Sequence, residues 1–177
     1  METKITELYD DLFLIELVPQ IRGFDNFIGA WVYLGDKTFL VDPGPSSTAS
    51  ALLNTLKKIN VTNIDYILLT HIHMDHSGGV GDIAANFRKT PIVCHKAGIT
   101  HLENPERLWK GSVKTLKDKA YAYGEIKPVD KNQLVDAENF SSMHVTPIIT
   151  PGHSSHHVSF IIDRYLFAGE AGGVSLS

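Results

Sequence analysis

Three histidines and an aspartate fall within six residues of this sequence. Residues 70–79 read THIHMDHSGG and directly follow the apolar run YILL. In an extended segment alternate residues point the same way, so His71, His73 and Asp75 are expected to project to one side. The turn that follows is expected to bring His76 round to join them. Imidazole nitrogens with a carboxylate suit zinc, iron or manganese, whereas calcium and magnesium prefer oxygen ligands. The spacing therefore predicts a transition-metal site.

A solvated polar loop is the plain alternative for this segment, because histidine and aspartate also occur in loops for their polarity alone. A single histidine would be explained in that way. Four donors in the pattern HxHxDH, after an apolar strand and before glycines, favour the metal site instead. Gly78 and Gly79 allow the backbone to bend tightly and to begin a helix beside the metal without obstruction by a side chain.

Further donors lie downstream, each at the end of an apolar run. Residues 150–157 read TPGHSSHH, and the proline and glycine indicate a turn that places His153 on a loop. His156 and His157 are nearby, but a polar loop before the strand VSFII explains them adequately. Glu170, in LFAGEAGG, follows another apolar strand and precedes glycines, so its carboxylate is a candidate bridge between two metals.

The elements that must position these residues alternate between strands and helices. Short aliphatic, aromatic and β-branched runs predict strands, and leucine and isoleucine at helical spacing after LVDPGPS predict a helix. The expected strands cover residues 12–18, 27–34, 38–41, 66–70, 91–94, 143–149, 158–162 and 165–168. The expected helices cover 46–59, 78–86 and 105–123, and the polar stretch 125–139 is expected to be a surface loop. This order predicts an α/β (α+β layered) domain with helices covering sheet faces.

Length and composition limit the other classes of function. The 177 residues fit a single domain, 1–177, and 43% hydrophobic with 20% charged residues is typical of a globular protein. A formal charge of -4 provides no basic field for nucleic acid. Cys94 alone cannot form an internal disulfide, and a buried strand residue is its natural role. The start METKITELYDDL lacks a leader pattern, and no apolar run reaches membrane-spanning length, so a cytoplasmic protein without a membrane partner is expected.

Taken together, these motifs resemble the metallo-β-lactamase superfamily. The resemblance rests on HxHxDH at 71–76, on His153 in PGHS and on the acidic Glu170 after a strand and glycine. FLVDPG, which contains Asp42, also looks like an early strand-end motif of that family. The resemblance runs from about Phe27 to the C-terminus and implies an αβ/βα sandwich in which strand-end loops gather one or two metals at the sheet edge.

The resemblance also implies a role for each donor. His71, His73 and His153 are expected to bind a first metal. Asp75 and His76 are expected to bind a second. Zinc is the first expectation for these ions, and iron or manganese are the alternatives.

Glu170 would then lie between the two metals, and Asp42 would orient a ligand by hydrogen bond rather than bind metal. A turn-forming aspartate before Pro43 is an equally weighted alternative for Asp42. The family usually has aspartate where this chain has Glu170, which is one methylene longer. Family members also continue with a helix, a strand and a last histidine, whereas this chain ends at Ser177. A domain incomplete at its C-terminal end, lacking that helix and strand and holding the second metal weakly, is therefore expected.

The chemistry expected of such a site is hydrolysis of a small carbonyl substrate. Metal coordination lowers the pKa of water to about 7 in the best cases, so a metal-bound hydroxide is available to attack an ester, thioester or lactone. Asp75 is the expected catalytic residue, since it would orient the hydroxide. Within the family, the motif is more similar to hydroxyacylglutathione hydrolases and lactonases than to antibiotic-cleaving members. Two alternatives are a mononuclear-iron sulfur dioxygenase and a non-catalytic metal-binding member; the sequence leaves the oligomeric state open.

Overall fold

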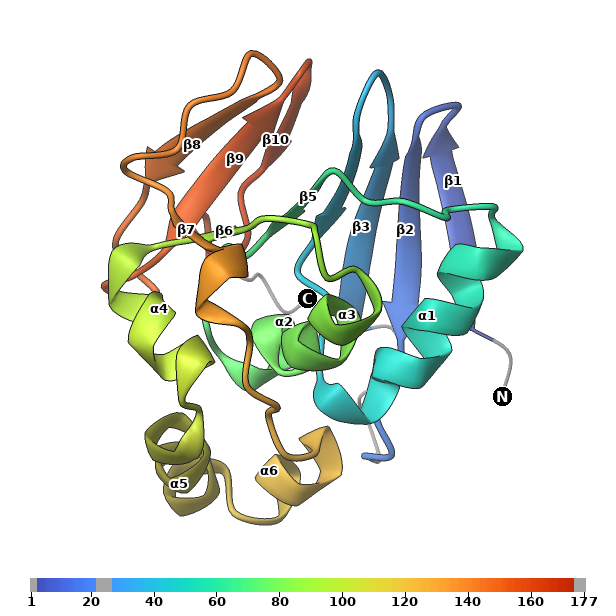
Figure 1. Ribbon diagram of the computed structural model, residues 1–177. Coiled ribbons are helices and arrows are strands. Elements are labelled where there is room, and N and C mark those ends of the chain that lie inside the picture. Colours follow the sequence, from blue (N-terminus) through green and yellow to red (C-terminus); the bar gives the residue numbers. More distant parts are fainter. Residues whose placement is uncertain (1–2, 22–26, 174–177) are drawn as a thin grey trace.

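Two sheets of unequal size pack face to face in the computed structural model, which describes residues 3–21 and 27–173 (Figure 1). The larger sheet has seven strands in sequence order, β1 to β7, and the smaller sheet has the order β10-β9-β8. Strands β1 to β4 pair antiparallel, whereas β4 to β7 pair parallel. The large-sheet strands are β1 (Ile5–Tyr9), β2 (Leu12–Leu17), β3 (Ile28–Leu34), β4 (Thr38–Val41), β5 (Tyr66–Leu68), β6 (Ile92–Cys94) and β7 (Leu134–Asp136). The small-sheet strands are β8 (Val145–Ile149), β9 (Val158–Ile162) and β10 (Tyr165–Phe167).

Helices cover the face of the large sheet that is turned away from the small one (Figure 1). They are α1 (Ala49–Lys58), α2 (Met74–Ser77), α3 (Val80–Asn86), α4 (Lys96–Glu103), α5 (Glu106–Leu116) and α6 (Asp118–Tyr123), with short 3-10 turns η1 (Ser46–Thr48) and η2 (Lys131–Gln133). No helix of the described chain combines the length and apolar character that crossing a bilayer requires. The arrangement confirms the layered α/β class that the order of elements predicted.

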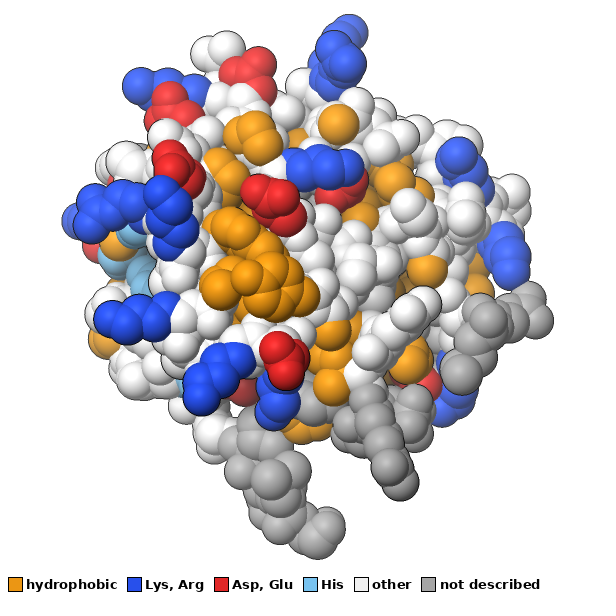
Figure 2. Space-filling model, turned by 90° about the horizontal axis from the view of Figure 1, so that it is seen from below, with side chains coloured by type: hydrophobic (Ala, Val, Ile, Leu, Met, Phe, Trp, Pro, Cys, Tyr) orange, Lys and Arg blue, Asp and Glu red, His pale blue; other side chains and the backbone are white. Residues whose placement is uncertain are grey.

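The single helix expected over residues 105–123 is wrong, because the chain breaks at Lys117. Lys117 adopts φ 53, a left-handed conformation that ends α5, and its backbone N–H still bonds to the carbonyl of Val113. The break re-aims the chain so that Ala120 and Tyr123 of α6 become buried, while α5 buries no residue completely. Figure 2 views the molecule from the side of these helices and shows hydrophobic side chains in the middle of the face, with acidic and basic side chains interleaved around them.

Five elements were not predicted, namely β1, α2, α4, η2 and β7. The segment that carries Asp75 was expected to be extended, but it forms α2, and Asp75 falls outside the compact donor group of His71 and His73. Strand β1 is an edge strand whose residues are half-buried or exposed, so it lacks the alternation that marks a strand. Helix α4 begins directly after β6, where His95 caps it by accepting a hydrogen bond from the N–H of Ala97. The stretch 125–139, expected to be a loop, contains η2 and β7, and its strand is fixed by parallel pairing with β6.

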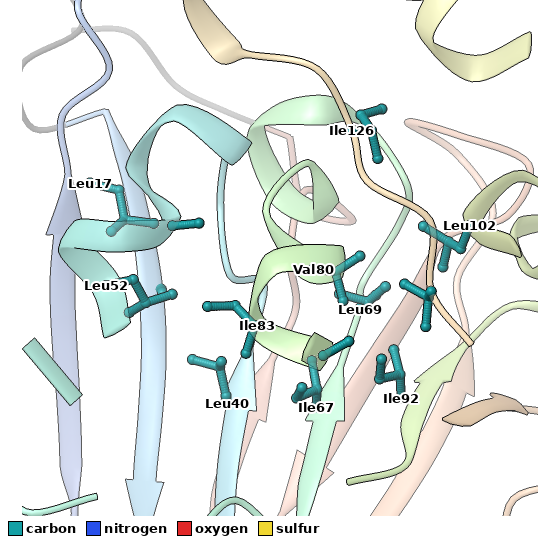
Figure 3. Close-up of a cluster of buried hydrophobic side chains, with 14 of the residues drawn as sticks. Leu17, Leu40, Leu52, Ile67, Leu69, Val80, Ile83, Ile92, Leu102 and Ile126 are labelled. Carbon is teal, nitrogen blue, oxygen red and sulfur yellow. The ribbon is translucent and has the colours of Figure 1, made fainter. Parts of the chain in front are cut away.

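Two hydrophobic cores hold the layers together. The first lies between the helices and the large sheet, and Figure 3 shows side chains of both converging there, with Ile83 of α3 next to Leu40 and Ile67 of the strands. Full burial of a leucine or isoleucine side chain stabilises a fold by about 2 kcal/mol. The second core lies between the two sheets and includes Phe39 and Phe160. Packing of both sheet faces fixes where the strand ends meet, and those ends carry the site.

Candidate metal centre

Four side chains from three strand-end loops converge beside the carboxyl end of β5. The ligand atoms that His71, His73, His153 and Glu170 offer all lie within 4.8 Å of one another. The Glu170 Oε2 atom is 2.8 Å from His153 Nε2 and 3.4 Å from His71 Nε2. His153 Nε2 is also 2.9 Å from His73 Nδ1. The sequence singled out all four of these residues as first-metal or bridging donors, and the fold brings them together.

His71 shows that this cluster suits a cation. Its side chain is buried, and burial together with the neighbouring imidazoles strongly lowers its pKa, so the ring is neutral. The Thr70 hydroxyl donates to Asp42 Oδ2, so Thr70 Oγ1 accepts from His71 Nδ1–H at 3.1 Å. The lone pair therefore belongs to His71 Nε2, which is buried without a hydrogen-bond partner. A buried unsatisfied nitrogen costs about 1–3 kcal/mol, and a metal ion would satisfy it.

A second group of donors, Asp75 and His76, lies beside the first, and the ring of His76 is 4.1 Å from that of His71. His76 Nε2 is 3.6 Å from Glu170 Oε2 and 3.8 Å from Asp75 Oδ2. His76 and Asp75 fall outside the compact group of four. His76 lies next to the Glu170 carboxylate, so that carboxylate is close to the group of four and to His76 of the second set, as a bridging role requires.

Asp42 anchors this side of the site through three hydrogen bonds. Its carboxylate accepts the Thr70 backbone N–H at 2.8 Å, the Thr70 hydroxyl at 2.6 Å and His76 Nδ1–H at 2.9 Å. Burial would lower the pKa of His76, but the Asp42 carboxylate outweighs it and raises this pKa to about 9. Because Nδ1–H is bonded to Asp42, the Nε2 atom of His76 faces Asp75 and Glu170. Asp42 also adopts φ 50, which an aspartate tolerates.

The glycines after the motif allow two loops to approach closely. A Cβ at Gly79 would lie 3.1 Å from the carbonyl oxygen of Pro45, and one at Gly78 would lie 2.4 Å from that of Met74. The Gly79 N–H bonds to the carbonyl of Gly44 at 2.7 Å. These contacts hold the loop that carries Asp42 against the start of the helices that follow HxHxDH.

His156 and His157 take different places from the four clustered donors. The His157 side chain is completely buried and engages both ring nitrogens, with Thr150 and with the backbone of Glu170. His156 is half-buried, with its ring 6.0 Å from that of His73, and its Nε2 atom is buried without a partner. Burial lowers the pKa of His156 to about 4. Neither residue belongs to the group of four.

A cavity adjoins the second group of donors. Its volume is about 460 Å³, in the range of small-molecule pockets. Its lining includes the polar side chains of His76, Asp42 and Glu170 and the apolar side chains of Leu12, Trp31 and Phe167. A small molecule with a polar and an apolar part fits this lining.

Two residues that shape the site were missed in the sequence. Thr70 bridges Asp42 and His71 with one hydroxyl, and His157 binds the backbone of Glu170. Thr70 reads as an ordinary strand residue, and His157 reads as a polar loop residue. No spacing in the sequence links Thr70 to Asp42 or His157 to Glu170, because these partners lie in loops at the ends of other strands.

Comparison with known proteins agrees with this geometry. Residues 26–176 match the model of the metallo-beta-lactamase superfamily. The metallo-beta-lactamase fold-containing protein ST1585 of Sulfurisphaera tokodaii is 30% identical over 161 residues, which cover 85% of this chain and 59% of that protein. A hydroxyacylglutathione hydrolase of Shewanella halifaxensis is 26% identical, with 89% of this chain and 51% of that protein covered. The chain thus spans between half and three-fifths of the length of these two relatives.

A solved structure supports the same relationship. The crystal structure of ST1585 from Sulfolobus tokodaii matches with a TM-score of 0.79 and 26% identity, and the match covers 94% of this chain and 66% of that one. The family model, the fold and the histidine cluster at the strand ends agree. The chain belongs to the metallo-beta-lactamase superfamily.

Proposed function

We propose that this chain is a metal-dependent hydrolase of a small carbonyl substrate, an ester, thioester or lactone. The observation that carries the proposal is the group His71, His73, His153 and Glu170, in which the buried Nε2 of His71 has no partner other than a prospective cation. The similarity to proteins named hydroxyacylglutathione hydrolase supports the reaction class. Zinc is the proposed metal, because three imidazoles and a carboxylate suit it.

The position of each residue in the site indicates its role in the proposed reaction. A transition metal bound by this cluster would supply a Lewis acid and lower the pKa of a coordinated water to about 7. His71, His73 and His153 would hold the first ion, and the Glu170 carboxylate would face both groups of donors. Asp75, at the rim of the second group, would orient the attacking water and receive its proton.

The cavity beside His76 is the proposed position of the substrate. A carbonyl would lie beside its polar lining residues His76 and Glu170, and the apolar lining residues would contact the acyl part. The formal charge of -4 supports a small-molecule substrate over nucleic acid, and on the face that Figure 2 shows the basic side chains are interleaved with acidic ones.

Metal content and turnover test the proposal together. Protein purified without chelator or added metal would be analysed for elements per chain and assayed against a panel of esters, thioesters and lactones. We expect zinc, and hydrolysis of at least one substrate class. His71→Ala should lose the metal, and Asp75→Asn should keep first-site metal and lose most of the turnover. Full zinc occupancy with no hydrolysis across the panel would contradict the hydrolase and leave a non-catalytic metal-binding protein.

A mononuclear-iron dioxygenase is the second candidate function. The observation that favours it is the single compact group: among the described residues, only one set of donors meets metal-ligand spacing, and Asp75 and His76 lie outside it. One tightly held iron per chain, with oxygen consumption on a sulfur substrate, would establish this function in place of hydrolysis.

A further inference from the structure

The Glu170 carboxylate sits on a tight turn at the end of β10. Gly169, just before it, adopts φ 53, a conformation that favours glycine. A Cβ at Gly169 would lie 2.7 Å from His157 Nε2 and 2.8 Å from Thr70 Cβ. The turn is therefore packed directly against one residue of the loop after β5 in the large sheet and one residue of the loop before β9 in the small sheet.

A chain of hydrogen bonds leaves this turn and returns to it. The Glu170 backbone N–H donates to His157 Nε2 at 3.1 Å, and His157 Nδ1 lies 2.9 Å from Thr150 Oγ1. Thr150 Oγ1 lies 3.0 Å from Ser159 Oγ, and the Ser159 hydroxyl donates to the carbonyl of Ala168 at 3.2 Å. The circuit starts and ends within three residues, and its middle members lie on β9 and the loop before it.

The direction of every bond in this circuit is fixed by its two ends. A backbone N–H can only donate, so His157 Nε2 must carry the lone pair, and the neutral ring must carry its proton on Nδ1. The carbonyl of Ala168 can only accept, so the Ser159 hydroxyl proton is used there and Ser159 Oγ accepts from Thr150. Thr150 in turn accepts from His157 Nδ1–H. One arrangement of protons satisfies all four bonds.

His157 is completely buried, and its ring stacks on that of His71 with centroids 5.3 Å apart. Both of its nitrogens are used, so it has no lone pair left for a metal. His157 is buried between the imidazole of His71 and the backbone of Glu170. It can therefore set the position of both of these residues.

We propose that His157 is a positioning residue for Glu170, acting through the circuit formed with Thr150, Ser159 and Ala168. The circuit fixes the backbone of the 168–170 turn and thereby aims the Glu170 carboxylate at His71 and His153. The inference rests on the proposed function in one respect only, namely that Glu170 helps to bind the metal.

Zinc affinity in a double-mutant cycle tests this directly. The full-length variants would be His157→Leu, Glu170→Gln and the double variant, each titrated with zinc against a chromophoric chelator. Loss of a hydrogen-bonding partner of a ligand typically weakens metal binding by about 10–100-fold, and we expect that loss in His157→Leu. The double variant should bind zinc no more weakly than Glu170→Gln alone. The reason is that loss of His157 weakens zinc binding by displacing the Glu170 carboxylate, which the double variant already lacks.

Each outcome of the cycle is decisive. Unchanged zinc affinity in Glu170→Gln would show that Glu170 does not help to bind the metal, and would overturn the role that the proposed function gives to this residue. Weaker binding in Glu170→Gln, with a fully additional loss in the double variant, would overturn the positioning role of His157 and leave the proposed function standing. His157→Gln offers an acceptor and a donor in one side chain, so it should recover much of the affinity that leucine loses.

Two less disruptive variants test the same proposal if His157→Leu does not fold. Thr150→Val and Ser159→Ala each interrupt the circuit, and each should weaken zinc binding by a smaller factor of about 3–10. Thr146→Val, on the exposed part of β8, is the matched control and should leave the affinity unchanged. Nitrogen-15 NMR of the imidazoles should show His157 neutral with its proton on Nδ1. A proton on Nε2 of His157 would overturn the proposal. So would equal zinc affinities in Thr150→Val, Ser159→Ala and the control Thr146→Val.

Discussion

One buried residue beside each sheet holds the candidate site in place, and these two supports differ in charge. The large-sheet support is Asp42, directly after β4, whose carboxylate accepts three hydrogen bonds, from Thr70 twice and from His76. The small-sheet support is His157, directly before β9, whose neutral ring connects Glu170 to Thr150. Both supports are buried and both orient a residue that faces the cluster.

The difference follows from what each support must hold. The groups around Asp42 are donors, an imidazole N–H, a hydroxyl and a backbone N–H, so an anion satisfies them all. The group that His157 must hold belongs to an acidic residue. A second carboxylate there would repel Glu170, and a cation would pair with it and compete with the metal. A neutral imidazole can hold its backbone without either effect.

Removing the charge from the large-sheet support should have the largest effect on stability. In Asp42→Asn the amide would present N–H groups to His76 and Thr70, which are themselves donors there. Breaking such a buried pair should lower the free energy of unfolding of the metal-free protein by about 3 kcal/mol, measured by urea denaturation at pH 7. Asparagine tolerates the positive φ of Asp42, so the backbone is not the cause. The exposed Asp36→Asn is the control, and a loss no larger than in that variant would show that the charge is unimportant.

The same support should make stability depend on pH. The pKa of His76 is raised from 6.5 to about 9, chiefly by Asp42 acting against burial, so the folded state favours the protonated ring. The stabilisation is then complete below pH 6.5 and is lost as the pH rises through about 9. Urea denaturation of metal-free protein from pH 6 to 10 should show this decline, and Asp42→Asn should remove it. An equal decline in both proteins would assign the effect to another group.

A substitution at Gly169 should disturb the contact between the 168–170 turn and the small-sheet support, His157. Gly169→Ala places a Cβ against His157 and Thr70 at a residue with φ 53. We expect the free energy of unfolding to fall by about 2 kcal/mol, because strain at such a position adds to the contact. Gly172→Ala is the matched control, since a Cβ at Gly172 meets nothing within 4 Å. Similar thermal unfolding of the two variants would show that the 168–170 turn adapts freely.

Two isosteric substitutions, one next to each support, compare how much a hydrogen bond at each support contributes to the free energy of unfolding. Thr70→Val removes a hydroxyl bonded to a carboxylate, and Thr150→Val removes one bonded to neutral partners. Hydrogen bonds to charged groups contribute about 1.5–3 kcal/mol and neutral ones about 0.5–1.5, so Thr70→Val should be the more destabilising by about 1 kcal/mol. Urea denaturation of both metal-free variants gives the comparison. A larger loss in Thr150→Val would reverse the ranking of the supports.

Much of the fold could be predicted from local patterns. Strand and helix periods indicated the layered class. The helix over 105–123 was wrong, because the turn at Lys117 depends on packing that buries Ala120 and Tyr123, and the loop expected over 125–139 was wrong as well. Strand β7 is half-buried and only three residues long, so its pairing with β6 defines it more than its composition does. Short elements of this kind carry too few residues for a period to be visible.

The sequence by itself determined which donors the site would use. HxHxDH concentrates His71 and His73 in one loop, and ligand chemistry depends on residue type and local spacing alone. The sequence also indicated His153 and Glu170 as donors, but only the tertiary structure brings their ligand atoms to those of His71 and His73, and only it reveals that Thr70 and His157 hold the site in place. The reason is geometric: hydrogen bonds between loops on different strands depend on how the two sheets pack, and that packing is set by the whole core at once.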